Sequence, residues 1–337
     1  MKVLLAALKF DYNDSSRGYS FEYENFYKSM INMRDVEVIF FDISDFNDLK
    51  RFEENNKNLL KTIYQEKPDV FFYIPYKENI RREVLQEIKN IKEITSVCWF
   101  SDDHWRFETF SKELCFYFDY CITTDRESIE KYHQIGYKNV ILSQWACNVH
   151  TYRKLNLPKK YDVSFVGQPH GTRREIINIL RKNGISVACF GYGWDNSLLK
   201  RAWNAFAKRI GLEFLTFKMG RVTQEEMIRI FNQSKINLNL SNSSDKGFPR
   251  QIKGRNFEVP GCGSFLLTEK VSHLEDYYEL DKEVVTYSNI DEMIKKIRYY
   301  LTHDQEREAI AQKGYEKTIR FHKYEDRFRD IFQKIGK

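Results

Sequence analysis

Residues 250–269, RQIKGRNFEVPGCGSFLLTE, hold the pattern that decides the fold. On a helix, Gln251, Arg255 and Glu258 would fall at positions i, i+4 and i+7 and would share one face. Pro260 lacks an N–H and the glycine after it accepts the left-handed conformation, so the pattern predicts that the helix stops there. The uninterrupted apolar run that follows is typical of a strand buried on both faces of a parallel sheet.

An arginine and a glutamate on one helix face, at the carboxyl end of a parallel sheet, can hold a nucleotide. The guanidinium of Arg255 can pair with phosphate in a forked geometry, and the carboxylate of Glu258 can accept hydrogen bonds from ribose hydroxyls. The alternative interpretation is a surface ion pair at i, i+3, which contributes little to stability. Spacing alone leaves both interpretations open.

The rest of the chain alternates strand-like and helix-like segments in two series. This order predicts an α/β protein with two parallel, doubly wound sheets, in which ligands bind at the carboxyl ends of the strands. The strand candidates are Val3–Leu8, Val36–Phe41, Asp69–Ile74, Ile94–Phe100, Tyr117–Thr123 and Val140–Leu142 in the first series, and Tyr161–Gly167, Ile185–Phe190, Ile236–Leu240, Ser264–Thr268 and Val284–Tyr287 in the second.

Two loops at strand ends in the first series are rich in polar side chains. Residues 11–24, DYNDSSRGYSFEYE, carry Gly18 and Glu22, and the run SDDHWR after the fourth strand candidate carries Asp103 and His104. Aspartate, glutamate and histidine side chains in such places can transfer protons. Solvated loops with capping aspartates are the alternative.

The first strand of the second series leads into a glycine-containing loop, QPHGTRRE. Gly167 lets the backbone approach a ligand closely, and Arg173 stands where the next helix begins. The start of a helix behind such a loop can seat a pyrophosphate, because its N–H groups and dipole favour anions. An ordinary strand-to-helix turn is the alternative.

The composition is that of a soluble protein of 337 residues, long enough for two domains. No apolar run approaches the roughly 20 residues that span a bilayer, and the start MKVLLAALKFDYND predicts a core strand and not a signal peptide. Scattered cysteines without metal-ligand spacing predict reduced thiols in a cytoplasmic protein. A net charge of +6 permits phosphorylated donors but does not argue for nucleic acid.

Residues 198–221 interleave basic and aromatic side chains. A segment of this kind can lie on an anionic membrane surface, which would make the protein peripheral at the inner face of the membrane. A surface helix with solvated lysines and arginines is the alternative.

Residues 250–269 resemble the C-terminal signature of GT-B glycosyltransferases, in the branch related to the spore-maturation protein CgeB. That branch shows the pattern K-x-R-x-F-E followed by G-C-G-x-x-L-L-T-E. The matching residues are Lys253, Arg255, Phe257, Glu258, Gly261, Cys262, Gly263, Leu266, Leu267, Thr268 and Glu269. The loops of the first series resemble two further motifs of the branch through Arg17, Gly18, Ser20 and Glu22, and through Trp99, Phe100, Asp102, Asp103 and Trp105.

The resemblance implies the GT-B fold, with two Rossmann-like domains facing across a cleft. Residues 1–152 would form the acceptor-side domain and residues 153–318 the domain that binds a nucleotide sugar. Residues 319–337 would form a C-terminal helix that crosses back to the first domain.

The resemblance also implies roles for individual residues. Glu258 would hold the ribose of the donor, while Arg255, Lys253 and Arg173 would neutralise its diphosphate. Gly167 and Gly18 would line the binding loops. Asp103, His104 and Glu22 would contact the sugar or transfer protons.

The implied activity is transfer of a sugar from a nucleoside-diphosphate sugar, a UDP-sugar above all, to a hydroxyl group. The acceptor would be a glycan, a lipid-linked molecule or a protein, in cell-surface or spore polysaccharide synthesis. No metal and no tightly bound cofactor would be needed, and retaining stereochemistry is favoured. Retaining families often carry a glutamate eight positions before Glu258, where this chain has Arg250. A sugar-nucleotide epimerase and a non-catalytic scaffold or coat protein are the alternatives.

Overall fold

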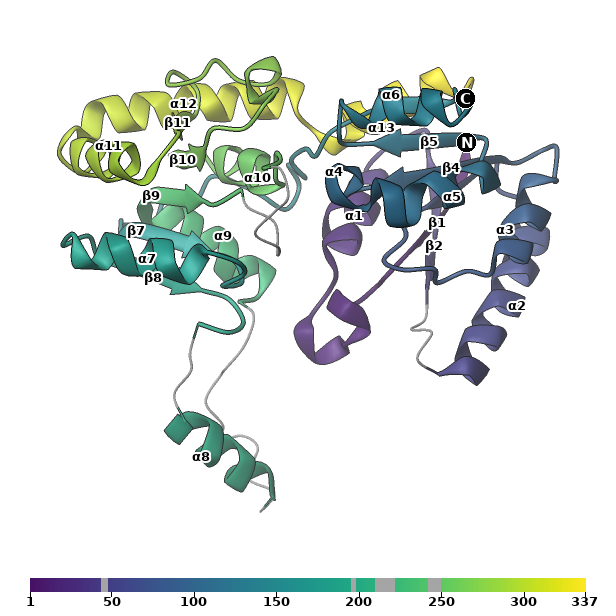
Figure 1. The fold of residues 1–337 in the computed structure, drawn as a ribbon, viewed down its shortest axis with the longest axis horizontal. Coiled ribbons are helices and arrows are strands. Elements are labelled where there is room, and N and C mark those ends of the chain that lie inside the picture. The colour runs from purple at the N-terminus through teal and green to yellow at the C-terminus, as the bar shows by residue number, and fades with distance from the viewer. Residues whose placement is uncertain (44–47, 195–197, 210–221, 242–249) are drawn as a thin grey trace. The chain divides into compact units, whose positions relative to one another are not determined.

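The computed structural model describes residues 1–43, 48–194, 198–209, 222–241 and 250–337. The chain divides into two compact units (Figure 1). Unit 1 comprises Met1–Tyr152 and Thr318–Lys337, and unit 2 comprises Arg153–Lys317. Each unit contains one parallel sheet with helices packed against it.

Unit 1 is built on a six-stranded parallel sheet with the order β2-β1-β3-β4-β5-β6. The chain leaves β1 towards one side for β2 and returns to the other side for β3. The carboxyl ends of β1 and β3 therefore form the topological switch point, where doubly wound sheets bind ligands. The strands are β1 (Lys2–Ala7), β2 (Glu37–Asp42), β3 (Val70–Tyr73), β4 (Thr95–Phe100), β5 (Tyr120–Thr123) and β6 (Val140–Leu142), which confirms every strand expected in the first series.

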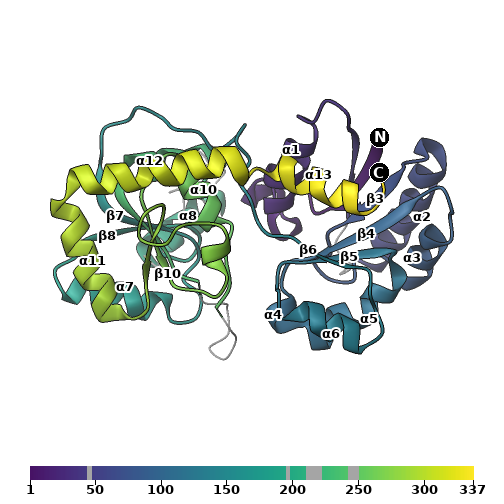
Figure 2. The ribbon, with the colours of Figure 1, turned by 90° about the horizontal axis from the view of Figure 1, so that it is seen from above.

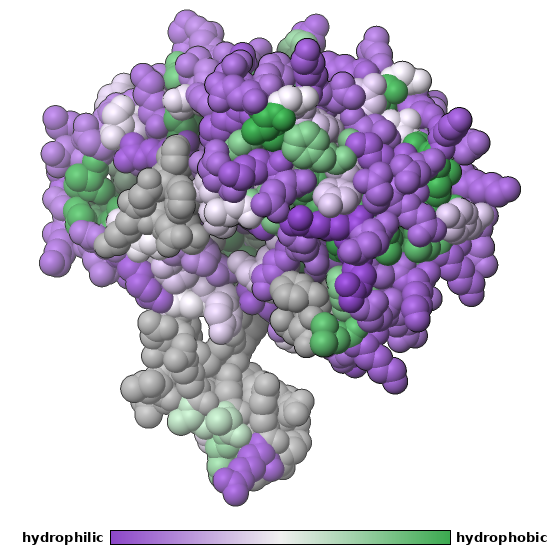
Figure 3. Space-filling model, turned by 45° about the vertical axis from the view of Figure 1, so that its right-hand side comes forward, coloured by the Kyte–Doolittle hydropathy of each residue, from purple (hydrophilic) through white to green (hydrophobic). Residues whose placement is uncertain are grey.

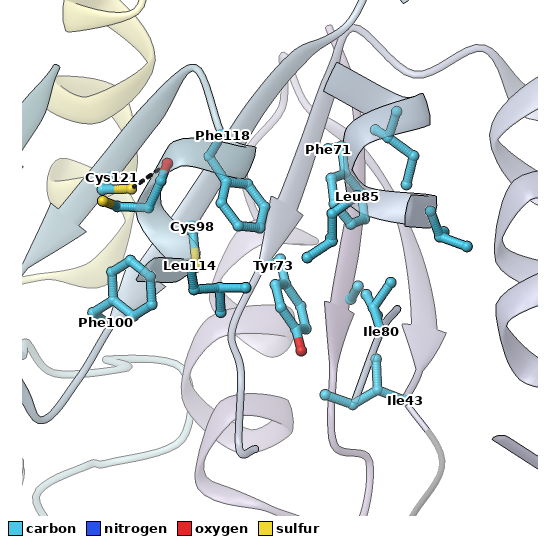
Figure 4. Packing of buried hydrophobic residues seen from close by; sticks show 14 of the residues in the cluster. Ile43, Phe71, Tyr73, Ile80, Leu85, Cys98, Phe100, Leu114, Phe118 and Cys121 are labelled. Carbon is cyan, nitrogen blue, oxygen red and sulfur yellow. Dashed lines mark hydrogen bonds between the residues drawn. The ribbon is translucent and has the colours of Figure 1, made fainter. Parts of the chain in front are cut away.

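Several helices cover one face of this sheet, and a core rich in aromatic side chains lies between them and the strands. Phe71 and Tyr73 point to this face because side chains alternate along a strand. The Tyr73 ring stacks on Phe118 at 6.0 Å between centroids, and Figure 4 shows both among aliphatic side chains that include Leu85. The helices here are α2 (Leu49–Glu66), α3 (Arg82–Lys89), α5 (Lys112–Leu114) and α6 (Ser128–Gln134), and the short α4 (Asp103–Arg106) follows β4.

The opposite face is covered by the helical segment after β1 and by the last helix of the chain. The ring of Phe328 lies 5.6 Å from Phe26 and 6.3 Å from Phe72, and Phe26 lies 4.9 Å from Trp99. In Figure 2 the last helix runs beside α1. The C-terminal helix therefore belongs to the core of unit 1. The elements are a π-helical turn (Tyr23–Tyr27), α1 (Lys28–Met30) and α13 (Tyr324–Lys334).

Unit 2 contains a five-stranded parallel sheet with the order β11-β10-β9-β7-β8. Its switch point lies between β7 and β9. The strands are β7 (Tyr161–Val166), β8 (Val187–Phe190), β9 (Ser234–Asn239), β10 (Leu266–Glu269) and β11 (Val285–Tyr287), and each corresponds to an expected strand. The helices are α7 (Arg173–Lys182), α8 (Leu198–Arg209), α9 (Gln224–Gln233), α10 (Arg255–Gly261), α11 (Ile290–Thr302) and α12 (Asp304–Phe321).

The two faces of the second sheet differ in polarity. Ile236 and Leu238 of β9 pack into an apolar core with residues of α7, α11 and α12. Asn237, which alternates with them, turns to the other face and donates to the carbonyl oxygen of Phe231 in α9 at 3.1 Å. This face of the sheet can therefore pack against helices with buried polar side chains, because the polar groups on both sides form hydrogen bonds with each other.

The helix α10 differs in two respects from the expectation. Gln251 precedes the helix, which begins at Arg255, so it does not share the face of Arg255 and Glu258. Pro260 and Gly261 lie inside the helix instead of ending it. The left-handed residue is Gly263, with φ +64°, and its N–H donates to the carbonyl oxygen of Pro260 at 2.8 Å. Proline costs the helix one backbone bond, but the chain can turn only where a glycine adopts positive φ.

Hydrophilic residues cover most of the face drawn in Figure 3, and hydrophobic residues occur on it in small separate groups. Within the described ranges, no helix combines the length and the apolar character needed to cross a bilayer. The six cysteines are free thiols, and all but Cys189 are buried.

Candidate functional site

A buried network of amide and hydroxyl groups fastens α10 to the second sheet. Asn239 Nδ2 donates to Asn256 Oδ1 at 3.1 Å and to Thr268 Oγ1 at 3.0 Å, and Asn256 Nδ2 donates to the same threonine oxygen at 3.1 Å. The N–H of Lys253 donates to Asn256 Oδ1 at 2.9 Å. Because buried polar groups are costly without partners, the network fixes the rotation of α10 on the sheet.

That rotation places Glu258 against the sheet and Arg255 beside it. The Glu258 side chain is 0% exposed and pairs with Arg255 Nη1, whose side chain is 27% exposed. The Arg255 guanidinium also lies 5.5 Å from the ring centroid of Phe231. A fully buried carboxylate is not the ordinary surface ion pair that spacing alone allows, because taking the charge out of water costs several kcal/mol unless it is paired.

Arg173 joins the two loops of the switch point. Its Nη1 donates to the carbonyl oxygen of Gln168 after β7, and its Nη2 to that of Leu240 after β9, both at 3.0 Å. Burial, reinforced by the nearby charge of Arg255, lowers the pKa of Arg173 to about 10. The guanidinium is thus held by neutral carbonyls close to a like charge, an arrangement that favours an anion nearby.

Lys253 completes a cationic cluster around this switch point, and His170 lies beside it. Burial lowers the pKa of His170, and the charges of Arg173 and Lys253 lower it further. The name cationic cluster is used below for Arg173, Lys253 and Arg255, because the lowered pKa leaves His170 uncharged at neutral pH. Its members come from the start of α7, the start of α10 and the segment just before α10, so the structure brings together residues that are far apart in the sequence.

The loop at Gly167 is positioned by the turn after β8. Gly191 has φ +125°, and a Cβ there would stand 2.6 Å from the carbonyl oxygen of Gly167. Trp194 Nε1 donates to the same oxygen at 2.6 Å. Sequence reasoning missed both residues as supports of the site, and the glycine-rich run GYGW was the signal that could have found them.

Arg250, which departs from the family pattern, has a carboxylate partner at the end of β10. Its Nε lies 2.9 Å from Glu269 Oε1, while the N–H of Ser241 donates to Glu269 Oε2 at 3.2 Å. Burial raises the pKa of Glu269, and the charges of Arg250 and Arg173 oppose that shift. The arginine therefore faces the same edge of the sheet as the cationic cluster.

In unit 1 the loop after β1 folds back on itself. Gly18 is exposed with φ +82°, and its carbonyl oxygen accepts a bond from the N–H of Asp11 at 3.0 Å. Arg17 pairs with the Asp11 carboxylate at 3.1 Å. Ser20 is buried, and its hydroxyl donates to the carbonyl oxygen of Leu8 and accepts from the N–H of Tyr23. Glu22 is half-buried at the start of the following helical turn.

The neighbouring residues Asp103 and His104, which follow β4, differ in how deeply they are buried. Asp103 is 1% exposed, and its Oδ2 accepts a bond from the hydroxyl of Tyr132 at 3.0 Å. Burial raises the pKa of Asp103 to about 6, against the hydrogen bonds that it accepts. His104 is half-buried as a residue, and both nitrogens of its ring lie below the surface. Asp103 thus lies inside unit 1, a position that favours holding the loop in place over touching a substrate.

In the part of the chain that the structure describes, no group of three or more His, Cys, Asp or Glu side chains is placed to hold a metal ion.

Comparison with known proteins agrees with the two parallel sheets. HepE of Anabaena, in complex with UDP and glucose, superimposes with a TM-score of 0.64 at 12% identity over 99% of each chain. The chain has the fold of a GT-B glycosyltransferase. Sucrose-phosphate synthase of Thermosynechococcus elongatus superimposes with a TM-score of 0.65, again at 12% identity, over 98% of this chain and 97% of that one.

Sequence comparison supports the CgeB-like branch within this fold. Residues 173–333 match the model of a family described as glycosyl transferase-like. The spore protein CgeB of Bacillus subtilis (strain 168) is 19% identical over 238 residues, which make up 68% of this chain and 71% of CgeB. The resemblance expected from residues 250–269 is thereby confirmed.

We expect Asp103→Asn to change stability in a pH-dependent way. The folded-state pKa of Asp103 is raised, so the wild type binds the proton more tightly when folded and loses that stabilisation as pH rises through about 6. The asparagine keeps an acceptor for Tyr132 and cannot ionise. Relative to wild type, its unfolding free energy should therefore rise by on the order of 1–3 kcal/mol between about pH 4 and about pH 8.

Urea denaturation of both proteins at the two pH values measures this difference. Tyr132→Phe is the companion variant, since it removes the donor and should lose more stability at the higher pH. A difference between Asp103→Asn and wild type that is the same at both pH values would contradict the buried, titrating carboxyl group.

Proposed function

We propose that the protein transfers a sugar from a nucleoside-diphosphate sugar to a hydroxyl acceptor. The observation that carries this proposal is the cationic cluster beside the buried Glu258, at the switch point of the second sheet. A diphosphate fits a cluster of this charge, because anions bind where cations and helix N-termini converge. The solved structure of HepE with UDP and glucose supports a UDP-sugar as the donor.

The proposed donor site assigns one role to each charged group. Arg255, with Lys253 and Arg173, stabilises the negative charge that develops on the diphosphate as the bond to the sugar breaks. Glu258 accepts hydrogen bonds from the ribose hydroxyls. Gly167 lets the backbone of the loop after β7 pack closely on Phe165, because a Cβ at this residue would stand only 3.0 Å from the Phe165 ring.

We assign proton transfer to unit 1. His104 is the first candidate because it directly follows Asp103 at the end of β4, although both of its ring nitrogens lie below the surface in this conformation. Glu22 is the second, and Gly18 leaves room for an acceptor in the neighbouring loop, since nothing lies within 4 Å of a Cβ built there. Asp103 acts through its position in the loop and is a positioning residue in this proposal.

The charge arrangement supports one finer feature of the reaction, metal independence, and the resemblance of residues 250–269 to retaining families supports the other, its stereochemistry. Fixed cations replace a divalent metal at the leaving group, and we propose retention of configuration at the transferred carbon. Epimerisation and a non-catalytic scaffold role are separated from transfer by incubation with a panel of nucleotide sugars: a transferase hydrolyses its donor slowly to free sugar, an epimerase interconverts sugars, and a scaffold leaves the donor intact.

We propose a cytoplasmic protein that works on glycans or lipid-linked acceptors, in cell-surface or spore polysaccharide synthesis. Contact with the membrane through residues 198–221 is supported in α8, where Trp203 and Phe206 are 43% and 53% exposed. Residues 210–221 lie outside the described part of the chain.

Arg255→Ala is expected to weaken binding of UDP more than binding of uridine. Only UDP carries the phosphates that the guanidinium would contact, and a hydrogen bond to a charged group contributes about 1.5–3 kcal/mol. Glu258→Gln should weaken both ligands to the same extent, because both contain the ribose. Titration calorimetry with the two ligands measures the difference.

The matched control is Arg229→Ala, which removes an arginine from a surface Arg–Glu pair in the same unit. It should leave the affinity for both ligands unchanged. Equal losses for UDP and uridine in Arg255→Ala would remove this arginine from the phosphate site.

Turnover is expected to survive an excess of chelator. Donor hydrolysis or transfer assayed with and without EDTA should proceed at the same rate, because the cations at the leaving group are side chains. Loss of activity in EDTA that manganese restores would overturn the metal-independent mechanism.

His104→Ala is expected to lower kcat by about 10²–10⁴-fold, the usual contribution of a general acid or base. The affinity for UDP should stay within about twofold of wild type, since the proposed nucleotide contacts all lie in unit 2. His303→Ala, which removes an exposed histidine after α11, is the control. A His104→Ala variant with wild-type kcat would exclude the proton-transfer role.

A further inference from the structure

We infer that the carboxyl edge of the first sheet carries an aromatic platform that binds the sugar rings of an oligosaccharide acceptor. The platform consists of the ring pair Tyr12 and Tyr76, together with Tyr19, which is exposed in the same loop as Tyr12. This inference rests on the proposed glycosyl transfer and names the acceptor class for it: an uncharged carbohydrate chain, as opposed to a protein or a nucleic acid.

The platform spans the switch point of the first sheet. Tyr12 and Tyr19 lie in the loop after β1, and Tyr76 lies in the loop after β3. The rings of Tyr12 and Tyr76 meet edge to face, with centroids 5.6 Å apart. The order β2-β1-β3 makes these two loops diverge from neighbouring strands, which is where doubly wound sheets bind ligands.

All three rings are exposed and yet held in place. Their exposed fractions are 46% for Tyr12, 41% for Tyr19 and 38% for Tyr76. Tyr19 stacks on Tyr23 at 4.4 Å and on Phe10 at 5.6 Å between centroids. Rigid aromatic side chains lose little conformational entropy when a ligand covers them, so the platform is prepared for binding before the ligand arrives.

The backbone of the loop also keeps Tyr12 outside the core. Tyr12 has φ +53° and ψ +29°, and Asn13 has φ +59°. The left-handed region is unfavourable for a bulky residue, and such conformations concentrate at binding and active sites. The loop accepts this conformation although the exposed ring adds little to the core of unit 1.

The charges near the platform favour an uncharged ligand. Arg17, whose guanidinium lies 4.2 Å from the Tyr12 ring centroid, pairs with Asp11 at 3.1 Å. Lys28, which lies 5.5 Å from the Tyr19 ring centroid, pairs with Glu24 at 2.7 Å. Carboxylates of unit 1 balance these two cations, so a polyanion would gain little from them. A third cation, Lys77, lies 5.7 Å from the Tyr76 ring centroid, and a single ammonium group can donate to the hydroxyls of a sugar.

A sugar ring fits this chemistry. Its face of C–H groups is apolar and slightly positive, so it packs on the negative face of an aromatic ring, while its hydroxyls need hydrogen-bond partners at the rim. Ion-paired side chains such as Arg17 and Asp11 provide donors and acceptors there.

The platform borders the residue to which we assign proton transfer. Arg106 Nη1 donates to the carbonyl oxygen of Tyr76 at 3.2 Å, and Arg106 ends the short helix α4 that also contains His104. An oligosaccharide on the platform would therefore run towards the loop of His104. A terminal sugar could present its hydroxyl there.

The test is binding of the full chain to an array of neutral oligosaccharides in the presence of UDP. The wild type should bind at least one class of glycan. Tyr12→Ala and Tyr76→Ala should each lose about tenfold in affinity for it, in line with the contribution of one stacked ring. Tyr12→Phe and Tyr76→Phe keep the rings and should stay within about threefold of wild type.

Tyr64→Ala is the matched control, since Tyr64 is 53% exposed in the same unit but lies near the end of α2, before β3, at the opposite edge of the sheet. It should bind as the wild type does. Titration of each variant with UDP separates the two proposals: unchanged UDP affinity keeps the donor site intact, whereas a wild type that binds no nucleotide would overturn the proposed function itself.

Three results would overturn the platform while UDP binding stays normal. These are a wild type that binds no glycan on the array, alanine variants that bind glycans as well as the wild type does, and alanine variants that lose binding to a single-stranded DNA oligonucleotide instead. The last result would assign the rings to base stacking.

Discussion

A carboxylate without exposed surface must be paired, and in unit 2 this constraint falls on Glu258. The charge of Arg255 balances it, and the network of Asn239, Asn256 and Thr268 keeps the helix in the rotation that the pair requires. Removing one partner of a buried pair costs about 3–5 kcal/mol, so sequence change at either residue is strongly restricted. Stability and the proposed ligand contacts therefore depend on the same two side chains, and the shape of the proposed donor site is set before any donor binds.

The two sheets use one topology for different chemistry. In both, the order of strands reverses beside the first strand of the unit, and the loops that diverge there carry the side chains of interest. In unit 2 these are cations held by carbonyl oxygens, as with Arg173. In unit 1 they are exposed rings and ion pairs such as Arg17–Asp11. The charged donor and the neutral acceptor that we propose would need such different surfaces, and the shared topology places each surface at the carboxyl edge of its sheet.

Much of this arrangement could be predicted from the sequence, because alternating strands and helices leave few topologies for a parallel sheet. Motif spacing likewise indicated Arg255 and Glu258. The burial of the Asn239 and Asn256 amides could not be predicted, because the sequence around an asparagine does not distinguish a buried side chain from one in a solvent-exposed turn. The contact of Gly191 with Gly167 depends on the approach of two separate loops. The inward direction of Asp103 depends on the turn after β4, which local sequence does not determine.

The placement of α13 has a consequence for how the chain folds during its synthesis. Phe328 fills the space between Phe26 and Phe72, so the core of unit 1 is incomplete until Phe328 itself has left the ribosome. The whole of unit 2, by contrast, is continuous in sequence and can fold as soon as Lys317 has emerged. The N-terminal unit therefore keeps one face of its sheet uncovered while the whole of unit 2 is being synthesised.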